Sequence, residues 1–336
     1  MRAKGMTYDT GFVHKGRSSR ERFDAGLVER ELRIIRDDLH CTAVQLVGGD
    51  PERLELAGHL AAGLGLEVWF SPYPLELTPE RIRALLLDCA ERAERLRAGG
   101  AEVVFVAGVE LTIMNRGFIE GDDIEARLGR LFGDRTLIAE LGGRLDAFFA
   151  AVVPAIRQRF HGKVTYAAIP LENPDWDRFD FVALELIRSA AVAGQFREGV
   201  RSLVARGKPV AATGFGTATW RGAGDDAPRS MEIVEHDPAT GLPVRVKDGY
   251  ERDEAGQAAY LRELLEIFDS EGVDSAFVYL FALYNYPHRP DDPRQDLDLA
   301  GVGIVKVYED RDGSTYPGLP WEPKAAFAAV AEHYRA

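Results

Sequence analysis

Short apolar runs alternate with amphipathic segments along almost the whole chain. Eight of these runs are near-continuously apolar, as expected of parallel strands that are covered on both faces. They lie at 5–12, 42–49, 66–74, 101–111, 163–172, 179–187, 208–216 and 273–284. Strands that alternate with helices are typical of βα units. The pattern therefore predicts an α/β protein with a single (β/α)8 TIM barrel over residues 1–336, and an open doubly wound sheet is the alternative.

The starts of the first three helices are marked by capping residues. Asp24 precedes the first helix, Asp50-Pro51 opens the second and Thr78-Pro79 opens the third. Each places an oxygen that can cap the free amides of a first turn. The later helices are predicted near 188–206, 254–271 and 322–334. Between the fifth and sixth strands the segment NPDWDR is too short for a full helix, so one βα unit is expected to be degenerate.

Two long segments, 217–253 and 285–321, follow the seventh and eighth predicted strands and are rich in Gly, Pro and Asp. In a barrel the loops after the carboxyl ends of the strands build the active site. We therefore expect these segments to form walls or lids of a site.

Composition and charge narrow the classes of partner. The 336 residues carry a net charge of −13 with 46% hydrophobic residues, which argues against a nucleic-acid partner, because binding phosphates needs a clustered positive surface. No apolar stretch reaches the length needed to span a membrane, so no membrane partner is expected.

Cys41 and Cys89 lie in apolar segments and are expected to be reduced, which favours a cytoplasmic location. The sequence contains no phosphate-binding loop and no Cys/His spacing typical of zinc sites. We therefore expect no metal and no organic cofactor. The sequence leaves the oligomeric state open.

Carboxylates and tyrosines follow the apolar runs, where a barrel presents side chains at its mouth. The candidate substrate-binding residues are Tyr8, Asp9, Ser71, Tyr73, Gly214, Trp220, Tyr284, Tyr286, His288 and Arg289. Flat aromatic rings can stack on a sugar, although any one of them can instead pack the core. His288 and Arg289 can bind an anionic group or sit in a solvated loop. The nearby Asp291, Asp292, Asp296 and Asp298 lack the spacing of a calcium loop and are expected to form a solvated face.

Three glutamates are candidate catalytic groups. Glu110 follows the apolar run VVFVAGV, where partial burial would raise the pKa of its carboxyl toward values useful in acid/base chemistry. Glu172 precedes Asn-Pro and is a second carboxylate, a ligand contact or a turn cap. Glu185 lies on an apolar strand, so it points into the mouth or pairs with a cation such as Arg188 or Lys163.

Several segments together resemble a known family. They are KGMTYDTG, DDLHCTAVQLVGGDPERL, LEVWFSPYPLELTP, CAERAERLRAGGAEVVFVAGVEL, FVYLFALYNYPHRP and GLPWEPKAAF. The chain resembles, over nearly its full length, actinobacterial proteins often labelled abortive phage infection protein. Those proteins are similar to clan A glycoside hydrolases, which are barrels with an acid/base Glu at the end of strand four and a nucleophilic Glu at the end of strand seven.

The resemblance assigns roles to two positions. Glu110 matches the acid/base, although Val109 stands where clan A usually has Asn. The family pattern T-E-F-G corresponds here to Thr213-Gly214-Phe215-Gly216, so Gly214 replaces the expected nucleophile.

Retaining hydrolysis needs two carboxyls about 5–5.5 Å apart, and glycine supplies none. The sequence therefore predicts a pseudoglycosidase acting at the anomeric centre of a sugar or glycoside by ring opening, isomerisation or Amadori-type rearrangement. Glu110 would protonate, and Glu185 or Glu172 would remove the C2 proton. The alternatives are inverting or atypical hydrolysis, with one of these two carboxylates activating water, and a catalytically inactive sugar-binding or phage-defence protein. Arg17 and Arg221 allow an anionic substrate.

Overall fold

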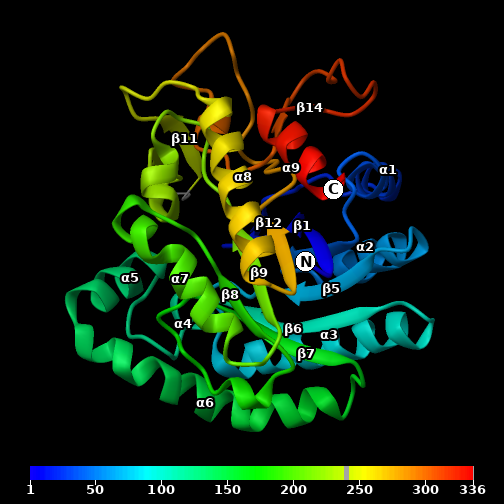
Figure 1. The fold of residues 1–336 in the computed structure, drawn as a ribbon, viewed down its shortest axis with the longest axis vertical. Coiled ribbons are helices and arrows are strands. Elements are labelled where there is room, and N and C mark those ends of the chain that lie inside the picture. The colour runs from blue at the N-terminus through cyan, green and yellow to red at the C-terminus, as the bar shows by residue number, and fades with distance from the viewer. Residues whose placement is uncertain (238–241, 336) are drawn as a thin grey trace.

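In the computed structural model, residues 1–237 and 242–335 are described, and their long parallel strands close into a barrel surrounded by helices (Figure 1). The order around the barrel is β1 (Ala3–Gly11), β4 (Ala43–Gly48), β5 (Glu67–Pro72), β6 (Val103–Val109), β7 (Lys163–Ala168), β8 (Val182–Glu185), β9 (Val210–Phe215) and β12 (Ser275–Val278). β12 pairs with β1, so the last barrel strand joins the first and closes the barrel. The predicted (β/α)8 barrel and its eight strands are confirmed, and the open sheet is excluded.

The helices cover the outside of the barrel. Their bounds are α1 (Ala25–Asp37), α2 (Pro51–Gly63), α3 (Pro79–Ala98), α4 (Leu111–Met114), α5 (Ile124–Gly133), α6 (Arg135–Arg157), α7 (Ala193–Val204), α8 (Glu254–Glu271) and α9 (Ala325–Arg335). The predicted starts of the first three are confirmed. Asp24 accepts a hydrogen bond from the amide of Leu27, and Asp50 accepts from two amides of the first turn of α2. Thr78 stands at the cap of α3, although its hydroxyl makes no capping hydrogen bond to a backbone amide of the first turn.

The fifth βα unit lacks its helix, as the short NPDWDR segment predicts. Between β7 and β8 the chain forms only the single 3-10 turn η1 (Trp176–Arg178), and a second turn, η2 (Ala190–Val192), leads into α7. The missing helix leaves a groove of about 620 Å³ along α7, lined largely by apolar side chains such as Trp176, Leu184 and Phe196.

Side chains that point into the barrel fill its lower part. Trp69 packs against Phe181 and Phe277 with ring centroids 5.0 and 4.7 Å apart. All three are buried, so the barrel interior is a packed core rather than a channel. Consequently a ligand cannot pass through the barrel at the level of these three rings.

The loops at that end contain short elements of their own. These are the hairpin β2 (Val13–His14) with β3 (Arg17–Ser18), the pair β10 (Val234–His236) with β11 (Pro243–Val246), and the pair β13 (Val305–Val307) with β14 (Trp321–Pro323), together with the 3-10 helices η3 (Ala223–Arg229) and η4 (Leu297–Leu299). The long segments after β9 and β12 thus build walls around the mouth, as predicted.

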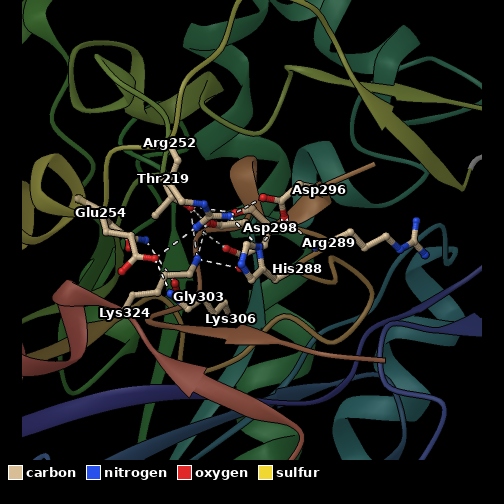
Figure 2. A network of polar contacts seen from close by, with 12 residues as sticks. Thr219, Arg252, Glu254, His288, Arg289, Asp296, Asp298, Gly303, Lys306 and Lys324 are labelled. Atoms are coloured by element: carbon tan, nitrogen blue, oxygen red, sulfur yellow. Dashed lines mark hydrogen bonds and ion pairs between the residues drawn. The ribbon is translucent and has the colours of Figure 1, made fainter. Parts of the chain in front are cut away.

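A buried ionic cluster fastens these two walls to each other (Figure 2). Arg252, from the segment after β9, pairs with Asp296 at 2.8 Å and with Asp298 at 2.9 Å. Lys324, just before α9, is fully buried and pairs with Asp298 at 2.8 Å. His288 lies 2.9 Å from Asp296. His288, Asp296 and Asp298 are grouped closely enough to hold a metal ion, but Arg252 and Lys324 already neutralise the carboxylates.

This cluster corrects one sequence-based expectation. Asp291 and Asp292 are exposed, as predicted for a solvated face, but Asp296 and Asp298 are buried. The pKa of Asp296 is lowered to about 2, because the hydrogen bond from His288 and the charge of Arg252 outweigh the effect of burial. The sequence could not reveal this, because the two cations come from distant parts of the chain.

Cys41 and Cys89 are free and buried, as expected. Burial raises the pKa of both thiols far above the usual value, so both behave as small apolar side chains. Among the helices of the described residues, none has the length and apolar character needed to cross a membrane.

Candidate active site

Two half-buried carboxyls face the mouth of the barrel. Glu110 directly follows β6, and Glu185 is the last residue of β8. The pKa of Glu110 is raised well above its usual value, first by burial and then by the negative charges of Glu185 and Glu172. Two tyrosines, Tyr73 and Tyr279, lie close to both carboxyls: after burial, the charges of Glu110 and Glu185 contribute to the raised pKa of each tyrosine. The site is therefore a pair of mutually repelling carboxyls enclosed by aromatic rings.

The backbone of Glu110 adopts a left-handed conformation, with φ of +45°. A side chain in this region costs about 1 kcal/mol or more, and such residues concentrate at functional sites. The strand β6 is ending here: the amide of Glu110 still donates to the carbonyl of Ala167 on β7, and its carbonyl already accepts from the first turn of α4. The turn thus lifts the Glu110 carboxyl out of the barrel wall.

Glu172 holds this turn in place. Its carboxylate accepts hydrogen bonds from the amide and hydroxyl of Thr112 at 3.1 and 2.7 Å, from the hydroxyl of Tyr166 at 2.8 Å and from the amide of Ile169 at 3.1 Å. Tyr166 in turn accepts from the amide of Leu111 at 2.8 Å. Burial raises the pKa of Glu172, and these bonds oppose the rise. Both oxygens of a fully buried carboxylate are engaged, which suits Glu172 to positioning Glu110.

The Tyr166→Phe variant is expected to lose about 1–3 kcal/mol of unfolding free energy, because the Leu111 amide would stay buried without a partner and the Glu172 carboxylate would lose one of its hydrogen bonds. Urea unfolding followed by circular dichroism measures this change. Tyr250→Phe is the matched control: Tyr250 is exposed and packs edge-on against Trp220, so a change below about 0.5 kcal/mol is expected. Equal stability of the two variants would contradict the clamp.

Glu185 lies directly against the backbone of Gly214 on the neighbouring strand. The two residues pair in the sheet between β8 and β9. A Cβ atom added to Gly214 would lie 1.9 Å from Oε2 of Glu185 and 2.7 Å from its Cδ. Atoms that are not bonded to each other cannot lie this close. The carboxyl of Glu185 can therefore occupy this place only because residue 214 has no side chain.

The charge state of Glu185 follows from its surroundings. Burial raises the pKa of Glu185 to about 7, with the charge of Glu172 adding to the rise and the Thr213 hydroxyl opposing it. Neither cation named from the sequence pairs with it. Arg188 pairs with Glu263 at 2.9 Å, and the Lys163 ammonium lies 5.4 Å from the centroid of the Phe181 ring.

A cavity of about 420 Å³, a size typical of small-molecule sites, opens at the mouth; Tyr73 and Tyr279 line it, whereas Glu185 is among the residues that line the groove along α7. Phe12, Tyr73, Tyr279 and Tyr286 give it aromatic walls, and Phe12 packs edge-on against Tyr73 at 5.0 Å. Arg17, from the β2–β3 hairpin, lies at its exposed rim. Arg221 is elsewhere, paired with Glu251 at 3.2 Å.

Two further predicted residues lie inside the barrel near the mouth. Asp9 is buried and accepts hydrogen bonds from the Gly11 amide at 2.6 Å and the Ser19 hydroxyl at 2.7 Å. Burial raises the pKa of Asp9 to about 6, although these bonds lower it. Ser71 is also buried and lies 3.4 Å from the Gln45 side-chain amide. Asp9 thus fastens the β2–β3 hairpin beside the site.

The other five predicted binding residues lie away from the mouth. Tyr8 and Tyr284 donate hydrogen bonds to Glu31 of α1, outside the barrel wall. Trp220 donates to the carbonyl of Ser230. His288 belongs to the buried ionic cluster, and Arg289 points away from it (Figure 2) and pairs with Glu309 at 2.7 Å. We leave these five out of the proposed site.

Tyr279 is the main site residue that was not predicted from the sequence. It follows β12, its peptide bond to Leu280 is cis, and its ring lines the cavity. Burial and the charges of Glu185, Asp9 and Glu110 raise the pKa of Tyr279 well above the usual value. A signal was present, because Tyr279 lies two residues after the inward-facing Phe277 and so continues the inward face of the strand.

No family model matches the sequence, and no curated protein is similar to it. Solved structures do match. A GH113 β-1,4-mannanase is 16% identical with a TM-score of 0.59, and the match covers 99% of each chain. A β-glucosidase, 1317, is 12% identical with a TM-score of 0.56 and coverage of 100% of this chain and 98% of its own. The endo-β-1,4-mannanase of Thermotoga petrophila is 10% identical with a TM-score of 0.54 and coverage of 100% and 76%. The chain therefore has the (β/α)8 barrel fold found in these glycoside hydrolases.

Proposed function

We propose that this protein is a carbohydrate-active enzyme that acts at the anomeric centre of a sugar glycoside, with Glu110 as its general acid/base. One observation carries the proposal. Glu110 stands in a left-handed turn at the barrel mouth, clamped from behind by Tyr166 and Glu172, with its pKa raised well above the usual value. The shared fold with mannanases and a β-glucosidase supports the choice of substrate class.

The proposed chemistry uses the two charge states of Glu110 in turn. The raised pKa favours the protonated form of this carboxyl, which can donate a proton to the glycosidic oxygen as the bond to the anomeric carbon breaks. The carboxylate that remains can then accept a proton from water or from a sugar hydroxyl. Tyr73, Tyr279 and Tyr286 would pack on the ring faces of the sugar.

A second candidate is the non-hydrolytic rearrangement expected of a pseudoglycosidase. The raised pKa of Glu185, about 7, favours it, since such a carboxylate is a stronger base toward a C2 proton than an ordinary one. Glu110 would then protonate the ring oxygen or an anomeric nitrogen, and the product would be a ketose. Both candidates use Glu110 as the proton donor and differ in the bond that breaks: the glycosidic bond in the first, and the bond from C2 to its proton in the second.

The test is an incubation in D2O with aryl O-glycosides and N-aryl glycosylamines, in which anomeric and C2 protons are followed by NMR. Release of the aglycone by the wild type, lost in Glu110→Gln, supports glycoside cleavage. Deuterium at C2 with a ketose product supports rearrangement instead. The matched control is Glu120→Gln, an exposed glutamate on the loop that follows α4, which should leave turnover unchanged. Binding of a sugar without turnover of any compound would overturn the proposal and favour a catalytically inactive protein.

A further inference from the structure

We propose that Glu185 is the nucleophile of the reaction and reaches the anomeric carbon from β8 across the space that Gly214 leaves empty on β9. The enzyme would then cleave glycosides with retention of configuration. The inference rests on the proposed function, because it assigns the second carboxyl of the same site.

The packing of the two strands carries this assignment. Glu185 and Gly214 are partners in the β8–β9 register. The Glu185 carboxyl fills the place where a Gly214 side chain would begin, with Oε2 1.9 Å from the position of the missing Cβ. Any other residue at 214 would push the carboxyl away from this place. Gly214 stands on β9 where the resemblance places the nucleophilic Glu. Its lack of a side chain leaves room there for the carboxyl of Glu185 from β8.

The surroundings of Glu185 keep its carboxyl available for chemistry. The two cations considered from the sequence as partners of Glu185 are engaged elsewhere: Arg188 pairs with Glu263, and the Lys163 ammonium lies over the Phe181 ring. Glu172, the third carboxyl of the site, has both oxygens occupied by the clamp beneath Glu110. Besides Glu110, Glu185 is thus the glutamate of the site whose carboxyl is suited to bond formation. After burial, the charge of Glu185 is the largest cause of the raised pKa of Glu110, which agrees with two carboxyls that lie near each other.

The reaction balances with these two groups and water. An oxygen of ionised Glu185 forms a bond to the anomeric carbon while the bond from that carbon to the leaving oxygen breaks, and Glu110 gives its proton to that oxygen. In the second step a water molecule attacks the anomeric carbon, Glu110 takes the water proton, and the bond to Glu185 breaks. Both carboxyls return to their starting states, and two inversions give retention.

Three measurements test the assignment on the glycoside that the wild type cleaves. The first-formed sugar anomer, followed by NMR, should have the configuration of the substrate. A 2-deoxy-2-fluoro glycoside with a good leaving group should add the mass of one sugar, and peptide mapping should place it on Glu185. Glu185→Ala should lose at least about 10³-fold in kcat, and sodium azide should restore turnover by yielding the glycosyl azide of opposite configuration.

The glycine has its own test. Gly214→Ala should lower kcat by about 10²-fold, because its Cβ displaces the carboxyl, and the loss should vanish when Glu185 is already Ala. Gly199→Ala on α7 is the control, since nothing lies within 4 Å of its added Cβ. If Gly214→Ala does not fold, the anomer and the labelled peptide still decide. A first product of inverted configuration, or a label on another residue, would overturn the role of Glu185 while leaving glycoside cleavage intact. Absence of Glu110-dependent turnover would instead overturn the proposed function.

Discussion

Glu31→Gln is expected to lower the free energy of unfolding by about 3–5 kcal/mol, the range found when one partner of a buried ion pair is removed. Glu31 and Arg20 are 0% and 1% exposed, and their charged groups are 2.7 Å apart. The indole of Trp321 and the hydroxyls of Tyr8 and Tyr284 also donate to this carboxylate. Glutamine nearly keeps the volume, but it leaves the Arg20 charge buried without a counter-ion and turns an amide donor toward groups that already donate.

Urea unfolding followed by circular dichroism measures this loss. The control is Glu29→Gln on the same helix, where an exposed pair with Arg33 predicts a change below about 1 kcal/mol. Equal midpoints for the two variants would show that the Glu31 pair adds little to stability. The expected effect is large because the variant breaks one side of a network that joins β1, α1 and the segment before α9.

Glu110→Gln is expected to lower turnover by about 10²–10⁴-fold and, at the same time, to stabilise the fold by about 1–2 kcal/mol at pH 8. The folded protein holds the Glu110 proton more tightly than the unfolded chain, where the pKa is 4.5. Stability from this group is therefore complete below about pH 4.5 and is lost as the pH rises through the raised folded pKa. Glutamine cannot ionise, so it escapes that loss.

The measurement is thermal unfolding of wild type and variant between pH 5 and pH 8. The difference in stability should widen with pH, because Glu185, with a pKa near 7, ionises in the same window and repels Glu110. Glu120→Gln, at an exposed position, should show no such trend. A variant that is less stable than the wild type at pH 8 would mean that the Glu110 charge is well solvated in the folded state.

The strands and most helix starts were readable from the sequence because they depend on local chemistry. Parallel strands covered on both faces must be apolar throughout, and Asp24 and Asp50 cap the amides that follow them. Glu110 was identifiable for the same reason, as the first charged residue after an apolar run. Long-range partners were not readable. Asp296 and Asp298 are buried because Arg252 and Lys324 reach them from distant segments.

The direction of side chains near strand ends was the other limit. Tyr8 and Asp9 are neighbours on β1, and successive side chains of a strand point to opposite faces. Only one of the two can face the barrel interior, and it is Asp9, while Tyr8 turns outward to Glu31. Similarly, Glu185 and Gly214 were both noted from the sequence, but only the register of β8 and β9 brings them together.

The ionic cluster between the walls also bears on how a ligand arrives. Residues on both sides of it, Met231 after β9 and Tyr286 and Val302 after β12, line the mouth cavity, and Arg252 pins these segments to each other. A cavity whose walls are already ordered loses little conformational entropy when it is filled. We therefore expect a ligand to bind by simple collision with a preformed cavity, so that association rates rise linearly with concentration and different sugars are distinguished chiefly by how fast they leave.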